Sequence, residues 1–502
     1  MMAKKVYTDY FFDEPAYNTH DGGYIPLTTP KIAPQPLVIP PLLEPDKQTA
    51  TDDYYTVEAQ ASETQFLPGK KTKTWGYNTG FLGKTIVFRN GKHTHIDLKN
   101  ALPELTTFHW HGLNVPGPIT DGGCHAPVYP GKTNHIDFDV DQPAATIWLH
   151  AHPCPSTALQ VWRGLAAMVL IKDDVEDQLP LPRNYGVDDI PMVLQDREFH
   201  EDNQFDYRAD YDPDGVQGHT ALVNGTVNPY FDVTTQRVRL RILDGSNRRE
   251  WRLHFDDGLT FAQVGSDGGI MPAPVYMDKV MLTCAERDEL VVDFGKYQPG
   301  DEVTLMTDDT PLCHFRIKAF EPDDTQLPDH LVDIEDPTPT PGLPVRKITM
   351  DGMDEEVAMD GKKFDMQRID ARQKVNDVAI WEIRNTNSTK NGMVHPFHVH
   401  GTQFQVLARN DGPVYPNEHG LKDTVGVNPG ETVRIKVQFK LTGVYMYHCH
   451  IIEHEDGGMM AQIESYDPDH PKTYHLMDMD TLTKAFAEEQ GVKPEDVWMP
   501  GM

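Results

Sequence analysis

The chain has 502 residues, with 77 acidic and 45 basic side chains and a formal net charge of -32 at pH 7. This length is too great for one hydrophobic core, so we expect about two to four domains. The strong negative charge argues against nucleic acid and against anionic membrane surfaces as partners.

The N-terminal part predicts neither a targeting segment nor a membrane span. Its first residues, "MMAKKVYTDYFFDEPAYNTH", lack the apolar stretch of a secretory signal, and no apolar run of about 20 residues follows. We therefore expect a cytoplasmic protein without a membrane partner. The proline-rich segment 28–45 has few backbone donors, so residues 1–50 are predicted to form an extended arm.

Strands dominate the pattern that follows. Apolar and polar residues alternate in segments 84–102, 236–255 and 431–439, which is the period of half-buried strands. Asn-Gly and Asp-Gly dipeptides separate such segments, as in β-sandwiches. The chain therefore predicts an all-β fold divided at changes of composition. The predicted parts are a first domain (51–175), a second without metal ligands (176–335), a linker (336–347), a third domain (348–470) and an acidic tail (471–502) with one short helix.

Histidines gather in four clusters, two in the first predicted domain and two in the third. Each cluster contains an H-x-H pair, and residues two apart in an extended strand point to one face. Four such pairs supply eight imidazoles, enough for several metal ions. The pairs are His109 and His111, His150 and His152, His398 and His400, and His448 and His450. A fifth pair, His93 and His95, alternates with core-facing residues and is expected to face solvent.

A second site is predicted on the opposite face of the last cluster. Cys449 points away from its two histidine neighbours, and a thiolate with two imidazoles and a long methionine bond is the ligand set of a blue-copper centre. His395, Cys449, His454 and Met459 supply that set. Zinc fits less well, because a structural zinc site takes about four ligands and usually more thiolates. The five cysteines do not suggest a disulfide framework, and whether Cys124 and Cys154 pair stays open.

The four cluster motifs resemble those of a known family. "HWHG", "WLHAH", "HPFHVHG" and "HCHIIEHEDGGMM" are similar to the copper motifs of multicopper oxidases, the family of laccases, bilirubin oxidases and bacterial cuprous oxidases. "QDREF", "LVNGTVNPYF", "LRILDGSNRR" and "GTQFQVLARN" resemble the bacterial three-domain branch, over most of residues 50–466. The resemblance implies three consecutive cupredoxin-like Greek-key β-sandwich domains. It places a trinuclear copper cluster between the first and third, with the second as a spacer that shapes the substrate cleft.

The resemblance also implies four copper ions per chain. His109 and His398 match the type 2 ligands. The type 3 pair is matched by His111, His150, His152, His400, His448 and His450, and type 1 copper by His395, Cys449, His454 and axial Met459. Glu455 and Asp121 are candidate proton relays, although each could instead orient a histidine or lie in solvent. Asp121 lies one residue further from "HWHG" than the corresponding acid of the family.

Three functions follow from these motifs. The first is a laccase-like oxidase that couples oxidation of phenols or aromatic amines to four-electron reduction of O2 to water, with a small-molecule reductant and O2 as partners of a monomer. The second is a cuprous oxidase, for which soft ligands would be needed near type 1 copper. Candidates for these are Met350, Met353, Met359 and Met366, although their spacing is also that of core residues. The third is a non-enzymatic copper-binding or scaffold protein on the same fold.

Overall fold

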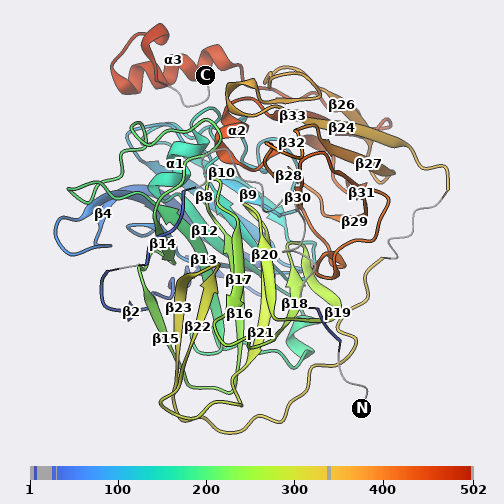
Figure 1. The fold of residues 1–502 in the computed structure, drawn as a ribbon. Helices are drawn as coiled ribbons and strands as arrows, with labels where there is room; N and C mark the ends of the chain where they lie inside the picture. Colours follow the sequence, from blue (N-terminus) through green and yellow to red (C-terminus); the bar gives the residue numbers. More distant parts are fainter. Residues whose placement is uncertain (1–4, 8–24, 30, 336–340, 499–502) are drawn as a thin grey trace.

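The computed structural model describes residues 5–7, 25–29, 31–335 and 341–498. These residues form three β-sandwiches that follow one another along the chain, each with an apolar core between two sheets. In Figure 1 the first is blue to cyan, the second green to yellow and the third orange to brown. The predicted all-β class is confirmed.

The first sandwich pairs a six-stranded sheet with a four-stranded one. The larger sheet has the order β10-β8-β4-β5-β6, with β3 on β4, and the smaller β7-β12-β11-β9. Their bounds are β3 Lys47–Gln48, β4 Asp52–Thr64, β5 Thr72–Tyr77, β6 Leu82–Gly83, β7 Ile86–Arg89, β8 His93–Ala101, β9 His109–His111, β10 Thr133–Asp139, β11 Ala145–His150 and β12 Ala166–Lys172. Alternate residues of β4 and β8 are buried, as the period of two predicts.

The second sandwich includes two short strands from the N-terminal arm. One sheet has the order β1-β19-β18-β21-β16-β13-β14 and the other β2-β15-β23-β22-β17-β20. Their bounds are β1 Val6–Tyr7, β2 Gln35–Pro36, β13 Asp189–Arg197, β14 Thr220–Val223, β15 Pro229–Val233, β16 Arg237–Asp244, β17 Trp251–Phe255, β18 Phe261–Ser266, β19 Gly269–Met277, β20 Lys279–Leu282, β21 Arg287–Asp293, β22 Glu302–Thr307 and β23 Thr310–Ile317. The arm therefore extends both sheets at an edge.

The third sandwich has two five-stranded sheets, ordered β25-β24-β27-β31-β29 and β26-β33-β32-β28-β30. Their bounds are β24 Val345–Asp351, β25 Ala358–Met359, β26 Ala371–Lys374, β27 Val378–Asn385, β28 His395–Val399, β29 Phe404–Arg409, β30 Thr424–Val427, β31 Thr432–Gln438, β32 Gly443–Cys449 and β33 Met460–Tyr466. The predicted segment 431–439 is β31, and segments 84–102 and 236–255 each hold two strands. Asn90-Gly91 does not close a hairpin, because β7 and β8 belong to different sheets.

Three short α-helices accompany the sheets: α1 (Thr157–Arg163), α2 (Ile452–Asp456) and α3 (Met479–Gln490), the last confirming the predicted tail helix. The described residues also form the 3₁₀ turns η2 Glu176–Gln178, η3 Asp354–Glu356, η4 Pro416–Glu418 and η5 Pro494–Asp496. The carboxylate of Asp456 in α2 accepts the main-chain N–H groups of Thr157 and Ala158, which begin α1. In the described part of the chain, no helix combines the length and apolar character needed to cross a bilayer.

Candidate metal centres

Two pairs of neighbouring strands bring the four H-x-H motifs together. In the first sandwich β9 pairs with β11, so that His109 lies opposite His150, and in the third β28 pairs with β32, so that His398 lies opposite His448. All eight imidazoles are buried. Rings from the two sandwiches stack on each other, His109 on His400 with centroids 3.9 Å apart and His111 on His398 at 3.7 Å. The eight histidines therefore form one cluster between the first and third sandwiches.

Most of the cluster imidazoles are fixed through Nδ1. Main-chain oxygens accept Nδ1–H of four of them at 2.8–3.0 Å: Asp121 O from His109, Ala151 O from His150, Asp423 O from His398 and Cys449 O from His448. Nε2 of His109, His150 and His398 is buried without a hydrogen-bond partner. Burial and the neighbouring imidazoles lower the pKa of His150 and His398, which keeps these rings neutral. Neutral imidazoles with one fixed nitrogen and one free nitrogen are what a metal cluster requires.

His111 is fixed through Nε2 instead of Nδ1. Its Nε2 lies 3.1 Å from Oδ1 of Asp423, while its Nδ1 is buried without a partner. Nη1 of Arg287 donates to the same carboxylate oxygen at 2.7 Å and lies 3.2 Å from the imidazole Nε2. An Nε2–H that donates to Asp423 leaves the Nδ1 lone pair for a metal. The second sandwich thus contributes Arg287 to the cluster and is more than the spacer that the resemblance implied.

One triple of imidazoles is already arranged around a common point. His152, His400 and His448 each place a ring nitrogen within 4.8 Å of the other two. Nε2 of His448 lies 3.1 Å from Nε2 of His400 and 3.5 Å from Nε2 of His152. Repulsion between metal-free lone pairs would oppose this approach, so the arrangement fits a bound cation.

The two candidate relay carboxylates both contact this triple. Oδ2 of Asp121 lies 2.8 Å from Nδ1 of His400. The carboxylate oxygens of Glu455 lie 3.3 Å from Nδ1 of His152 and 3.3 Å from Nδ1 of His448, without hydrogen-bond geometry. Burial alone would raise the pKa of Asp121, but His400 and His109 outweigh it and hold that pKa below its usual range. Burial, followed by repulsion from Asp456, raises the pKa of Glu455 far above its usual range.

A separate, smaller centre surrounds Cys449. Its Sγ lies 3.4 Å from Nδ1 of His395 and 3.7 Å from Nδ1 of His454, and all three side chains are buried. The outer nitrogens are held by the protein, since Nε2 of His395 lies 2.8 Å from the amide of Asn387 and Nε2 of His454 lies 3.1 Å from Oδ1 of Asp214. Burial raises the pKa of the Cys449 thiol, so a metal ion must displace its proton on binding.

The two adjacent methionines belong to different apolar clusters. Met459 lies in the same apolar cluster as Cys449, whereas Met460 begins β33 and packs with Cys124, Cys154 and other residues of a different cluster. Met459 is therefore the methionine on the side of the thiol. Cys124 and Cys154 are both free and buried.

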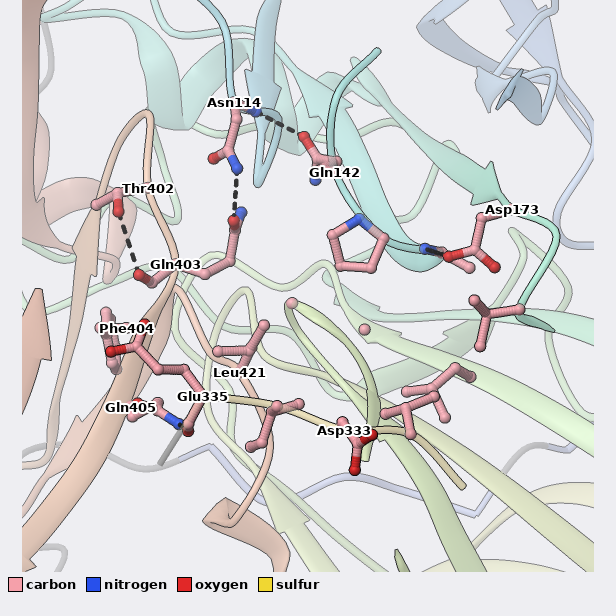
Figure 2. Close-up of a pocket in the computed structure, with 18 of the residues that line it drawn as sticks. Asn114, Gln142, Asp173, Asp333, Glu335, Thr402, Gln403, Phe404, Gln405 and Leu421 are labelled. Atoms are coloured by element: carbon pink, nitrogen blue, oxygen red, sulfur yellow. Dashed lines mark hydrogen bonds between the residues drawn. The ribbon is translucent and has the colours of Figure 1, made fainter. Parts of the chain in front are cut away.

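A large cavity adjoins the histidine cluster where the three sandwiches meet (Figure 2). It has a volume of about 640 Å³, and Asn114, Gln142 and Gln403 are among the residues that line it. Both glutamine side chains donate to the carbonyl oxygen of Gly112. A Cβ on that glycine would lie 2.8 Å from the guanidinium of Arg287. Two residues that line the cavity therefore contact the residue that follows His111.

Other residues singled out in the sequence lie elsewhere. His93 and His95 lie on β8, partly exposed, beside Asp139 and Asp52. Met350, Met359 and Met366 are buried in apolar clusters, as core residues would be. Sequence reasoning missed the groups that fix the imidazoles: Asn387, Asp423, Arg287 and Asp214. No motif or periodicity marks them. Arg287, Asp423 and Asp214 reach a histidine of another domain, and Asn387 reaches His395 within the third sandwich.

Comparison with known proteins agrees with this geometry. Family models described as multicopper oxidase match residues 58–176 and 338–469. The chain is 40% identical over 432 residues, 85% of this chain and 92% of the relative, to multicopper oxidase mco of Staphylococcus aureus. It is also 32% identical over 433 residues (81% and 87%) to cell division protein FtsP of Escherichia coli (strain K12).

Two solved structures from Pediococcus acidilactici are also similar. One is a multi-copper oxidase with 59% identity and a TM-score of 0.92, covering 94% of this chain and 100% of that one. The other is a laccase with 57% identity and a TM-score of 0.90, covering 93% and 100%. The expected cupredoxin-like three-domain architecture is confirmed.

Proposed function

This chain belongs to the multicopper oxidase family and is a copper-dependent oxidoreductase, and we propose that it couples oxidation of phenols and aromatic amines to the reduction of O2 to water. The similarity to a protein described as a laccase supports this choice of substrate. Both centres are built from residues of a single chain, which supports a monomer as the working unit.

Four copper ions fit the donor set. We assign the centre of His395, Cys449, His454 and Met459 to type 1 copper, because thiolate, two imidazoles and a thioether are its ligands. His109 and His398 are assigned to type 2 copper. The remaining six histidines are assigned to the type 3 pair, with His152, His400 and His448 on one ion and His111, His150 and His450 on the other.

The position of Cys449 between His448 and His450 carries the proposal. The side chain of Cys449 points to one centre and its two neighbours to the other, so the main chain connects the two centres through covalent bonds. Copper supplies the one-electron redox steps and the site of O2 reduction. The protein keeps both centres buried, which excludes bulk water, and leaves the cavity behind Gly112 as an approach for O2.

Two carboxylates are placed to supply protons. Glu455 contacts two type 3 histidines, and burial raises its pKa above the usual carboxyl range, which favours its protonated form. Asp121 has a lowered pKa and accepts a hydrogen bond from His400, which suits it to orient that ring. We therefore assign proton donation mainly to Glu455.

Oxidation of metal ions is the second candidate function. Asp214 next to His454 and the partly buried Met353 could approach a cation near type 1 copper. Against it, Met350, Met359 and Met366 are buried in cores and cannot receive Cu(I) at the surface. A scaffold function, which the similarity to FtsP raises, accounts for neither centre.

Oxygen uptake by the copper-loaded protein separates these functions. We expect uptake with phenols and aromatic amines, slower uptake with Cu(I), and loss of the absorbance near 600 nm together with all uptake in Cys449→Ser. Uptake with Cu(I) alone would favour the metal oxidase, and no uptake with any reductant would favour the scaffold.

A further inference from the structure

We propose that an aromatic pocket between the first sandwich, residues 204–208 and the C-terminal segment binds the phenolic reductant and passes its electron to the type 1 centre through Tyr207 and Glu453. This inference rests on the proposed oxidase function and adds the place where the phenol binds. The pocket has a volume of about 690 Å³, enough for a molecule of one or two rings.

The type 1 histidines themselves offer a phenol no surface. His395 and His454 are both 0% exposed, and Asn387 and Asp214 occupy their outer nitrogens. Pro396 follows His395, and Ile451 follows His450. The cavity that these two residues border has a volume of only about 10 Å³. That is about the space needed for one water molecule. A phenol must therefore give up its electron from a more distant position.

The walls of the aromatic pocket suit a flat, electron-rich ring. Trp75, Trp162, Phe205, Tyr207 and Trp498 line it. The centroids of Tyr207 and Trp498 are 6.1 Å apart, and those of Tyr207 and Trp162 are 6.2 Å apart. Such walls stabilise an aromatic guest by stacking and edge-to-face contacts.

Basic side chains at the pocket favour the ionised form of a phenol. Lys73, Arg163 and Arg208 line it together with Glu104 and Asp206, and Arg163 pairs with Glu104 at 3.3 Å, which leaves Lys73 and Arg208 against Asp206. The guanidinium of Arg163 lies 4.4 Å from the ring centroid of Trp75, and that of Arg208 lies 5.3 Å from that of Trp498. This local excess of positive charge contrasts with the net charge of -32 of the whole chain. A phenolate loses an electron more readily than a neutral phenol, so the charges select the reactive form.

A short route leads from this pocket to type 1 copper. The hydroxyl of Tyr207 donates to Oε1 of Glu453 at 2.8 Å, and Asn247 donates to the same oxygen at 2.8 Å. Glu453 directly precedes the ligand His454 in α2. The route therefore consists of one hydrogen bond and the covalent bonds of two adjacent residues.

The redox step balances with the proposed reaction. Each phenol loses one electron to the type 1 site and one proton to solvent, and becomes a phenoxyl radical. Four phenols supply the four electrons and four protons that convert one O2 into two water molecules.

Binding is tested on the copper-loaded, fully reduced enzyme without oxygen, in which 2,6-dimethoxyphenol cannot react. Calorimetry should show affinity weakened about 2- to 10-fold by Trp498→Ala, the loss of one aromatic contact, and also weakened by Arg208→Gln. Tyr297→Phe removes a matched hydroxyl–carboxylate hydrogen bond, to Asp257 in the second sandwich, and should leave affinity unchanged. Unchanged affinity in both Trp498→Ala and Arg208→Gln would overturn the pocket.

Electron transfer is tested by mixing the oxidised enzyme with reductant anaerobically and following the absorbance near 600 nm. Tyr207→Phe should slow reduction by 2,6-dimethoxyphenol at unchanged affinity, while reduction by the small ion hexacyanoferrate(II) stays normal. Equal rates for Tyr207→Phe and the parent with the phenol would overturn the route. If neither reductant bleaches the parent enzyme, the proposed function fails and the inference fails with it.

Discussion

Arg287 of the second sandwich and Asp423 of the third form a buried two-pronged ion pair, with Nη1 to Oδ1 at 2.7 Å and Nη2 to Oδ2 at 2.5 Å. The same carboxylate contacts His111 of the first sandwich at 3.1 Å. Three domains therefore meet in one contact that fixes the orientation of His111.

Asp423→Asn should weaken both the fold and the copper cluster. The change leaves the charge of Arg287 without its closest partner and no longer fixes Nε2–H of His111. The free energy of unfolding of the copper-free variant, measured in denaturant, should be about 3–5 kcal/mol lower than that of the parent. Copper analysis of the loaded variant should show less copper per chain.

The matched control for this prediction is Glu302→Gln. It breaks the exposed ion pair with Arg316 and should change stability by less than about 1 kcal/mol. A stable Asp423→Asn variant with full copper content would show that the three-domain contact does not position His111.

Met459→Leu should retain copper and raise the type 1 reduction potential. The thioether of Met459 would bind copper weakly and would tune its potential rather than hold the metal. Met460→Leu, on the other side of the chain, is the control and should leave the potential unchanged. Redox titration of the 600 nm band measures both, and equal shifts would mean that the axial ligand is misassigned.

Glu455→Gln should slow oxygen reduction without slowing oxidation of substrate. The amide cannot donate a proton, so steady-state turnover should fall by about 10²-fold or more. The fall should grow with pH, because free protons that could substitute become scarcer. Anaerobic reduction of type 1 copper should stay near normal. Copper loss in proportion to lost activity would instead assign Glu455 to holding His152 and His448 in place.

The docking of α3 should weaken as the pH rises. Glu489 accepts the main-chain N–H of Leu105, and burial raises its pKa to about 7, from about 4.3 in the unfolded chain. Because the pKa of Glu489 is higher in the folded protein, its contribution to the docking of α3 is fully present below about pH 4. This contribution is lost as the pH rises through 7. Hydrogen exchange in α3, corrected for intrinsic rates, should therefore show weaker protection at pH 8 than at pH 5.

Glu489→Gln removes this titration and should remove the dependence, whereas Glu488→Gln, an exposed neighbour, should keep it. The same pH dependence in Glu489→Gln and the parent would trace it to another group.

The sequence predicted those parts of the centres that depend on local geometry. Side chains two apart in a strand share a face, so the H-x-H motifs predicted paired imidazoles; β9 holds one whole pair, and the other three pairs begin at the ends of β11, β28 and β32. The change of face at Cys449 followed from the same rule. The alternating pattern predicted strands in segments 84–102, 236–255 and 431–439, where β7, β8, β16, β17 and β31 lie.

The parts that the sequence did not predict depend on contacts between distant residues. Arg287 and His111 are 176 residues apart, and Asp423 and His111 are 312 apart. No local pattern marks such residues, because their role arises only when the sandwiches pack. The helices α1 and α2 were also missed, since each is too short to show a helical period.

The stoichiometry of oxygen uptake tests the central claim most directly, namely that electrons from phenols pass through Cys449 to a cluster that reduces O2 completely. Copper-loaded enzyme is given a known amount of phenol in a closed oxygen electrode, and peroxide is assayed at the end. We predict that one O2 disappears for every four phenols oxidised to phenoxyl radicals and that no hydrogen peroxide forms. One O2 for every two phenols, with peroxide as the product, would contradict the account.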